Sequence, residues 1–441
     1  MNPVLKDNIL EFNLPVVDSR QLVKYKCLLA HKIYPIKGQT YISGNRHKIE
    51  LPKDTIGVKF TIKGYCMYVP ERVEYDYKDK DRTTRLLFKE LMGLCLDTIK
   101  MLDLNRGTRI LGLVMFAIME SLVMFVSTFK SRLNLRQLFS LTSLKYYKVA
   151  LQATMCTAAS GILHGMCPQE FFRNGETYER LVEQVKGRDK KMGLTIGQKI
   201  SRFILDNYAT LQPLYYQRLG FEGEWIPTGQ VEGLNREEPL VIPTRDYFRC
   251  VPFPNFKSQN FVHNSYQIQT FRSDPTLLDT YHINLCNYWT QLSLPIYYNM
   301  LALKLCNHLN LAELIKSLTI INMGMADTLL AINEAKYFYR IARPSKELIN
   351  TQLEISVEKP ITNSPSFPSE EAGLAGFCCK TLKRIIGQNE IDWEHYATLD
   401  QLEHDAGQVG IYMGIHWNED RVQGQTMGWR IAEYYGTIWN N

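Results

Sequence analysis

Seven polar residues near the C-terminus have the types and spacing that acid–base or anion-binding chemistry needs. They are Lys336, Arg343, Ser369, Glu370, Glu371, His416 and Asp420. The first two are seven residues apart, which is two turns of a helix, so we expect both cations to point the same way. Taken alone, this pair would also suit a solvated basic face.

The other five residues fall in two further segments. Ser369 followed by two glutamates predicts a helix start, because a serine hydroxyl accepts from the unpaired N–H groups there and carboxylates suit the positive helix end. The same N–H groups would also receive an anion. His416 and Asp420 are four residues apart, so on a helix the carboxylate would orient the imidazole and raise its basicity.

In this order and spacing the segments resemble the vanadium haloperoxidase and type-2 phosphatidic acid phosphatase superfamily. The superfamily pattern is Lys, six residues, Arg-Pro; then Pro-Ser-Gly-His; then Ser-Arg, five residues, His, three residues, Asp. Lys336 and Arg343-Pro344 match the first element. Pro368-Ser369 match the start of the second element, and His416 with Asp420 match the end of the third.

The resemblance covers most of the chain after about residue 95 and points to the soluble bacterial haloperoxidases. Its further matches are Gly193 to Gly197, Trp225-Ile226-Pro227, Ala326-Asp327, Glu334 and Gly424 to Gly428. It implies an all-helical double-bundle fold and a pocket in which a lysine and two arginines hold a tetrahedral oxyanion. It also implies that the histidine matching His416 attacks phosphorus in the phosphatases and ligates vanadate in the haloperoxidases, with the residue matching Asp420 in support.

The chain departs from the superfamily pattern at positions that set the charge of the pocket. Glu370 and Glu371 replace the Gly-His of the second element, and Val409-Gly410 replaces the Ser-Arg of the third. Three cations therefore become two, and Glu370 alone would reduce the net charge to +1. A carboxylate about 4 Å from an oxyanion oxygen costs about 4 kcal/mol at an effective dielectric of about 20, which weakens binding about a thousandfold. We therefore expect an altered vanadate or phosphate pocket.

The function that we favour is acid–base, non-oxidative chemistry on an apolar small-molecule substrate. A carboxyl group in an apolar pocket has a raised pKa and can act as a general acid or base. The aromatic-rich stretch from Tyr216 to Phe271 would wall such a pocket. The expected catalytic residues are His416, Asp420, Glu370 and Glu371, and the expected oxyanion-binding residues are Lys336, Arg343 and Ser369.

Three alternatives stay open. The chain would be a true vanadate-dependent haloperoxidase or acid phosphatase if the pocket tolerates its lost arginine. It would be a divalent-metal enzyme if Glu370, Glu371 and His416 hold a cation, since these are ligand types that iron, manganese and zinc accept. It would be a non-catalytic scaffold if the glutamates only form salt bridges with Lys336 and Arg343, because paired buried charges need no function.

Two regions must position these residues. In residues 1–85, Val58, Phe60 and Ile62 alternate with polar residues, which predicts strands. In residues 86–441, apolar residues recur three and four positions apart, which predicts a helical bundle domain. The expected fold class is therefore mainly α, a haloperoxidase-like helical bundle with a small β-rich N-terminal region.

Particular helices can be placed within the larger region. Ile110 to Phe129 is long and apolar enough for a membrane span, but Glu120 and Ser121 lie at its centre, where an ionised group in lipid is costly. We therefore expect a buried core helix and no membrane span. Further helices are expected from Asp279 to Arg343 and, as a single element, from Leu399 to Tyr434.

Composition narrows the protein class. With 441 residues, 45% of them hydrophobic and 22% charged, the chain is neither disordered nor a coiled-coil rod. The net charge of +6 is small and scattered, so we expect no nucleic-acid partner. The ten cysteines form no CxxC, which favours buried free thiols in a reducing compartment. No basic region followed by an apolar one opens the chain, so we expect a cytoplasmic protein; a homodimer stays open.

Overall fold

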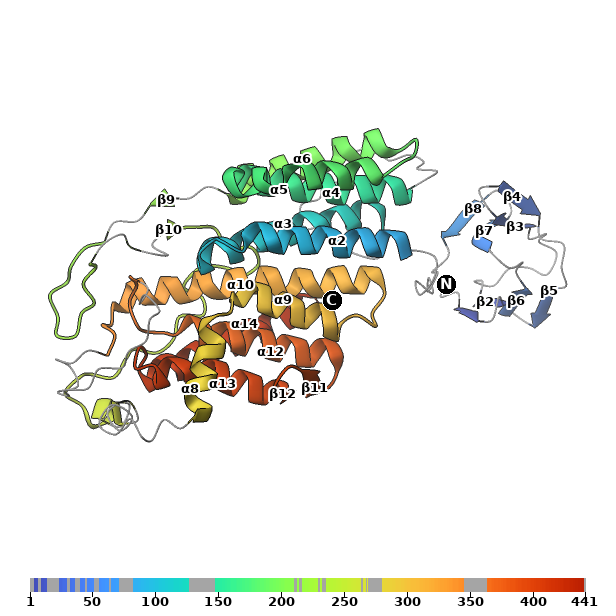
Figure 1. Cartoon of the computed structure of the whole chain (residues 1–441). Coiled ribbons are helices and arrows are strands. Elements are labelled where there is room, and N and C mark those ends of the chain that lie inside the picture. Colours follow the sequence, from blue (N-terminus) through green and yellow to red (C-terminus); the bar gives the residue numbers. More distant parts are fainter. Residues whose placement is uncertain are drawn as a thin grey trace. The chain divides into compact units, whose positions relative to one another are not determined.

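The computed structural model describes the backbone of eight strands between residues 4 and 70. From residue 82 on it describes residues 82–126, 147–209, 212–213, 216–228, 231, 235–262, 265–266, 268, 280–344 and 363–439. The chain divides into two compact units, Met1–Arg82 and Thr83–Asn441 (Figure 1).

The first unit is built from two antiparallel sheets of four strands each. The strands are β1 (Val4–Lys6), β2 (Ile9–Asn13), β3 (Lys24–Leu29), β4 (Lys32–Pro35), β5 (Thr40–Ser43), β6 (Arg46–Glu50), β7 (Thr55–Ile62) and β8 (Tyr65–Pro70). Their order is β1-β2-β6-β5 in one sheet and β4-β3-β7-β8 in the other. Strand β7, which contains the alternating Val58, Phe60 and Ile62, pairs with both β3 and β8. The predicted β-rich region is therefore present.

The second unit is mainly helical, as predicted. Its described helices are α2 (Arg82–Ile99), α3 (Leu104–Phe125), α4 (Tyr147–Met166), α5 (Pro168–Gln184), α6 (Lys190–Tyr208), α8 (Thr280–Thr290), α9 (Leu294–Leu305), α10 (Leu311–Tyr339), α12 (Glu370–Ile386), α13 (Leu399–Tyr412) and α14 (Asn418–Trp439). Two small sheets complete it, β9 (Gln212–Pro213) with β10 (Asn235–Arg236) and β11 (Glu390–Trp393) with β12 (Tyr396–Thr398).

Helix α3 is a core helix. The side chain of Asp103 accepts from the backbone N–H of Arg106 at 2.9 Å and caps its start. Every residue from Gly107 to Met124 is buried, so the segment predicted from Ile110 lies inside the protein; its predicted end, beyond residue 126, falls outside the described residues. Helices α3 and α10 are both long and apolar enough to cross a membrane, but both are mostly buried within the unit, as core helices of soluble proteins are.

Close packing of α12 on α14 brings the starts of these two helices together, and α12 also packs on α10 (Figure 1). A Cβ on Gly424 would lie 2.3 Å from the carbonyl oxygen of Ser369, and one on Gly428 would lie 2.2 Å from that of Gly373. Side chains at these two positions would push the helices apart. The glycines of α14 therefore let its first turn reach the first turn of α12.

Two predicted helix boundaries are wrong. Helix α10 ends at Tyr339 and not at Arg343, because Arg340 adopts the left-handed conformation with φ of 54°. The single helix expected from Leu399 to Tyr434 is two helices, α13 and α14. The chain turns between them, and Gly414 has a φ of 67°, which glycine adopts at little cost.

The cysteines in the described part of the chain are free thiols, and all but Cys286 are buried. Cys378 and Cys379 are neighbours in α12, and burial holds the pKa of both thiols well above the usual range. A thiol with a raised pKa is a poor nucleophile. These cysteines therefore pack as small apolar groups, in agreement with the prediction.

Candidate functional site

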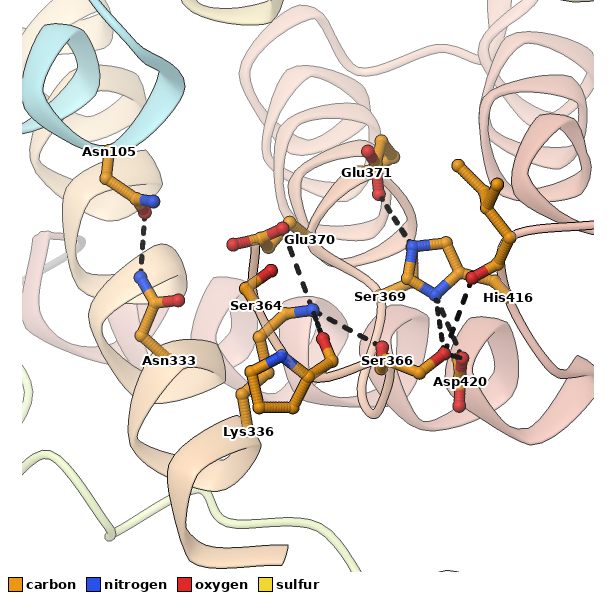
Figure 2. Close-up of polar contacts among 12 residues, drawn as sticks. Asn105, Asn333, Lys336, Ser364, Ser366, Ser369, Glu370, Glu371, His416 and Asp420 are labelled. Atoms are coloured by element: carbon orange, nitrogen blue, oxygen red, sulfur yellow. Dashed lines mark hydrogen bonds and ion pairs between the residues drawn. The ribbon is translucent and has the colours of Figure 1, made fainter. Parts of the chain in front are cut away.

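The structure brings all seven singled-out residues to one place. Figure 2 shows six of them, all but Arg343. Lys336 comes from the last turn of α10, and Arg343 from the segment that follows it. The segment 363–369 leads into the first turn of α12, which carries both glutamates. The turn before α14 and that helix's first turn supply the rest.

Lys336 is fully buried and paired. Its Nζ donates to the carbonyl oxygens of Pro365 at 2.6 Å and Ser366 at 3.3 Å. It also lies 3.7 Å from Oε2 of the buried Glu370. Burial lowers the pKa of Lys336, and the Glu370 carboxylate opposes this shift. Removing either partner would leave an uncompensated buried charge, so the two hold each other in place.

Arg343 reaches the site from beyond α10, which corrects the expectation that it shares a helix face with Lys336. Its Nε donates to the carbonyl oxygen of Ser364, and its Nη2 to the hydroxyl of the same serine, both at 3.2 Å. Its Nη1 donates to the carbonyl oxygen of Ile415 at 3.2 Å and lies 3.2 Å from Nε2 of His416. The guanidinium therefore joins the segment before α12 to the turn before α14.

Asp420 orients His416. Nδ1 of His416 lies 2.9 Å from Oδ2 of Asp420, although His416 belongs to the turn before α14 and only Asp420 to its first turn. The same Oδ2 accepts from the backbone N–H of Trp417 at 2.9 Å and from the Ser366 hydroxyl. An acceptor at Nδ1 keeps a proton there and turns Nε2 toward the site. Sequence reasoning missed Ser366, because no spacing rule places a serine of one segment beside the aspartate of another.

The outer nitrogen of His416 contacts two groups of opposite charge. Nε2 lies 3.5 Å from Oε2 of Glu371 and 3.2 Å from Nη1 of Arg343. A protonated Nε2 donates to Glu371, and an unprotonated one accepts from Arg343, so the partner of His416 changes with its charge. The exposed fraction of the side chain falls from 41% at Glu371 to 2% at His416 and 0% at Asp420. Glu371 is therefore the member that a ligand reaches first.

Glu371 is held as a carboxylate at the start of α12, which corrects the expectation of a raised pKa. Burial would raise its pKa, but the hydrogen bond and charge of a protonated His416, together with Lys336, hold that pKa below its usual range. The hydroxyl of Ser369, the residue before α12, accepts from the backbone N–H of Ala372 at 3.3 Å and donates to Oε2 of Glu371 at 3.1 Å. Ser369 therefore caps the helix and also steadies the carboxylate.

The aromatic-rich stretch supports His416 from behind. The buried Trp417 donates from Nε1 to the carbonyl oxygen of Ala342 at 2.9 Å. Its ring packs against Phe256 and Phe261, with centroids 6.3 Å and 5.0 Å away. These phenylalanines belong to the stretch expected to wall a substrate pocket, and they fix the residue next to His416. Parts of that stretch, including residues 269–271, lie outside the described residues.

Gly410, which stands where the superfamily pattern has arginine, lies against the imidazole. A Cβ on Gly410 would be 2.7 Å from Cδ2 of His416, which is closer than non-bonded carbons approach. The carbonyl oxygen of Gly410 also accepts from the backbone N–H groups of Ile415 and His416, at 2.9 Å and 3.1 Å. An arginine could enter here only if the imidazole moved.

The predicted metal-ligand set does not form. Among the residues that the structure describes, no group of three or more His, Cys, Asp or Glu side chains could hold a metal ion. Of the expected ligands Glu370, Glu371 and His416, the first turns toward Lys336 and away from the imidazole (Figure 2). The physical reason is that the fully buried ammonium of Lys336 needs a carboxylate beside it, and Glu370 supplies one.

A vanadate or phosphate does not fit the side chains in these positions. The resemblance implies that Nε2 of His416 would bind it, but Glu371 and Arg343 both contact that atom. Glu370 takes the contact with Lys336 that an oxyanion oxygen would need. The two cations are matched by the two glutamates, so the site offers an anion no net positive charge.

A partly buried amide pair lies one turn from Lys336. Asn333, one turn earlier on α10, donates from Nδ2 to Oδ1 of Asn105 at 2.7 Å (Figure 2). This bond ties α10 to the first turn of α3, next to the site. Sequence reasoning missed it because neither asparagine belongs to a motif.

Comparisons with known proteins agree on the fold. The sequence matches no protein-family profile and no curated protein. The structure aligns with that of a bacterial vanadium-dependent iodoperoxidase at a TM-score of 0.65 and 15% identity, over 80% of this chain and 96% of that one. Apo and holo structures of a bacterial vanadium-dependent chloroperoxidase align at TM-scores of 0.61 and 0.55 and 12% identity, over 77% of this chain and 94% and 92% of those chains.

The predicted haloperoxidase-like fold is therefore confirmed. At identities of 12% and 15%, these alignments establish only the fold. One fold hosts many activities, because the chemistry depends on the side chains of the site.

Proposed function

We propose that this chain is an enzyme that moves protons on an uncharged, largely apolar small molecule, with Glu371 contacting the substrate and His416 and Asp420 behind it. One observation carries the proposal. The three side chains form a continuous line of contacts, at 3.5 Å and 2.9 Å, whose outer end is exposed and whose inner end is buried. Such an arrangement presents one proton-accepting group to a ligand, while the side chains that support this group stay shielded from water.

The proton path follows from the geometry. Glu371 takes a proton from the bound ligand at Oε1, the oxygen turned away from the imidazole. The carboxyl group then rotates, so that the same proton passes from Oε1 to Nε2 of the neutral His416 and Glu371 is again a carboxylate. Asp420 then stabilises the imidazolium through Nδ1–H. Return of a proton to another atom of the ligand completes an isomerisation with no oxidant or reductant.

Arg343 keeps the cycle reversible. It donates to Nε2 while the imidazole is neutral and repels the proton once Nε2 carries one. Like charge at 3.2 Å therefore favours return of the proton along the path by which it came. Lys336, paired with Glu370, holds the surrounding segment and takes no part in the transfer.

The test is proton exchange on candidate substrates. The purified chain is incubated in D2O with a panel of apolar ketones and alkenes, and deuterium uptake and isomerised products are followed by mass spectrometry. We expect a substrate whose turnover falls at least about a hundredfold in Glu371→Gln and in His416→Ala. Glu419→Gln is the matched control, because the Glu419 side chain accepts from Gln423, one turn along α14, and forms no hydrogen bond or ion pair with the seven site residues in the described part of the chain. Full turnover in both site variants would refute the proposal.

One observation favours a second candidate, a non-catalytic binding protein. Lys336 and Glu370 are both buried and paired, as in a pocket that has been filled. On that view Glu371→Gln and His416→Ala alter stability but no ligand is ever turned over. The half-exposed Glu371 favours the enzyme instead, since a filled pocket needs no exposed carboxylate.

A further inference from the structure

A second hollow lies far from the site just described. It is a cavity of about 210 Å³ between the first half of α10 and the last turns of α12 and α14. Lys316, on its α10 wall, is twenty residues from Lys336 on the same helix, which is about 30 Å at the rise of an α-helix. The two places therefore cannot share one small ligand.

The cavity contains a buried polar atom without a partner. Thr381 of α12 lines it and is only 4% exposed, and its hydroxyl oxygen makes no hydrogen bond in the described part of the chain. Leaving a buried hydroxyl unpaired costs about 1–3 kcal/mol. The oxygen itself is covered by neighbouring atoms, so a rotation of the threonine side chain must turn the hydroxyl toward the cavity. A ligand group that then bonds to it gains affinity that an apolar group cannot.

A guanidinium is fixed in the lining of the cavity. Nη1 of Arg384 donates to the carbonyl oxygen of Ala432 at 2.8 Å. The guanidinium passes over Gly436, where a Cβ would lie 1.6 Å from Nη1 of Arg384. Only glycine at position 436 leaves room for this arrangement. One of the five N–H donors of the guanidinium is used by that carbonyl. The other N–H groups belong to the same guanidinium, so a ligand would meet them in a position that is already fixed.

Charge and walls define the ligand class. Arg384, Lys316 and Glu313 give the lining a formal charge of +1, and Trp439 is among the lining residues. An apolar cavity of about 150 Å³ already accepts a single benzene ring. A cavity of about 210 Å³ accepts a larger, fused-ring system.

We propose that this cavity, which we call the distal cavity, binds an aromatic carboxylate with two fused rings. Its carboxylate pairs with Arg384 and accepts from the Thr381 hydroxyl, while its rings lie against Trp439. The proposal is independent of the proton-transfer function, because none of these residues contacts the other site.

The experiment uses 1-naphthoate as probe and (1-naphthyl)methylammonium as the matched probe of opposite charge, each titrated into the full chain by calorimetry. We expect one naphthoate per chain and at least about tenfold weaker binding of the cation. Arg384→Gln should weaken naphthoate binding about tenfold or more, and Thr381→Val about fivefold. Arg202→Gln, which alters an exposed arginine elsewhere, should leave binding unchanged.

Several results would overturn the proposal. No saturable binding of naphthoate by the folded chain would do so, as would equal affinity in wild type and Arg384→Gln. Equal binding of the two probes would show that charge plays no part. Loss of binding in His416→Ala with none in Arg384→Gln would place the probe in the other site, whereas unchanged binding in His416→Ala supports the distal cavity.

Discussion

Removal of the Glu370 carboxylate should create an anion site that the wild type lacks. In Glu370→Ala, the side chain that lies 3.7 Å from Nζ of Lys336 is lost, together with its charge. A carboxylate about 4 Å from an anion's oxygen is worth about 4 kcal/mol of repulsion at an effective dielectric of about 20. We therefore expect orthophosphate to bind the variant about a thousandfold more tightly than the wild type.

The assay is urea unfolding with and without phosphate, at matched ionic strength in sodium chloride because salt screens charges. Without phosphate, Glu370→Ala should lose about 3–5 kcal/mol of unfolding free energy, since Lys336 is left buried and unpaired. Phosphate at about a hundred times its Kd should restore about 2.7 kcal/mol. The control is Glu433→Ala, which breaks an exposed pair with Lys380 far from the site.

Two outcomes would refute this reasoning. One is that phosphate stabilises the wild type as much as it stabilises Glu370→Ala, which would mean that Glu370 does not exclude anions. Alternatively, Glu370→Ala would respond to phosphate no more than Glu433→Ala, which would mean that the pairing of Lys336 is not what prevents anion binding.

Three further predictions concern the relay and its packing. Asp420→Asn should lower turnover at least about a hundredfold and the unfolding free energy by about 1–3 kcal/mol, and no change in kinetics or urea unfolding would contradict the orienting role. Gly410→Ala should cost about 1–3 kcal/mol and shift the His416 imidazole NMR signals, whereas Gly175→Ala, with no atom within 4 Å of its Cβ, should not destabilise the chain. The pKa of Glu371 is below its unfolded value of 4.5, so its stabilisation is complete above that pH and is lost as pH falls below it. Glu371→Gln should therefore lose less stability than the wild type between about pH 4.5 and 2.5, and parallel unfolding curves would contradict the assignment.

The local prediction around α12 needed only neighbouring residues. A serine followed by two glutamates starts a helix for reasons confined to one turn, and Ser369 caps α12 through Ala372. The pairing of His416 with Asp420 was likewise accessible from their spacing. Helical periodicity also predicted the buried helix α3, because apolar residues on all sides leave no face for solvent.

The remaining contacts depend on distant segments, which a single sequence does not place. The left-handed conformation of Arg340 ends the helix before Arg343, and no residue type in this segment predicts that conformation. The choice of Glu370 for Lys336, and of Glu371 for His416, depends on which side of the α12 start faces α10. Ser366 joined Asp420 only because the segment before α12 passes the start of α14.

The contact between Gly410 and His416 also couples these two positions. The imidazole occupies space that any side chain at position 410 would claim, so glycine there and the present place of His416 depend on each other. Substitutions in direct contact do not contribute independently to stability. An arginine at 410 alone would therefore be deleterious, and it becomes tolerable only when the turn from Met413 to Trp417 has shifted. Sequence change at position 410 is thus open to this chain only in combination with change in that turn.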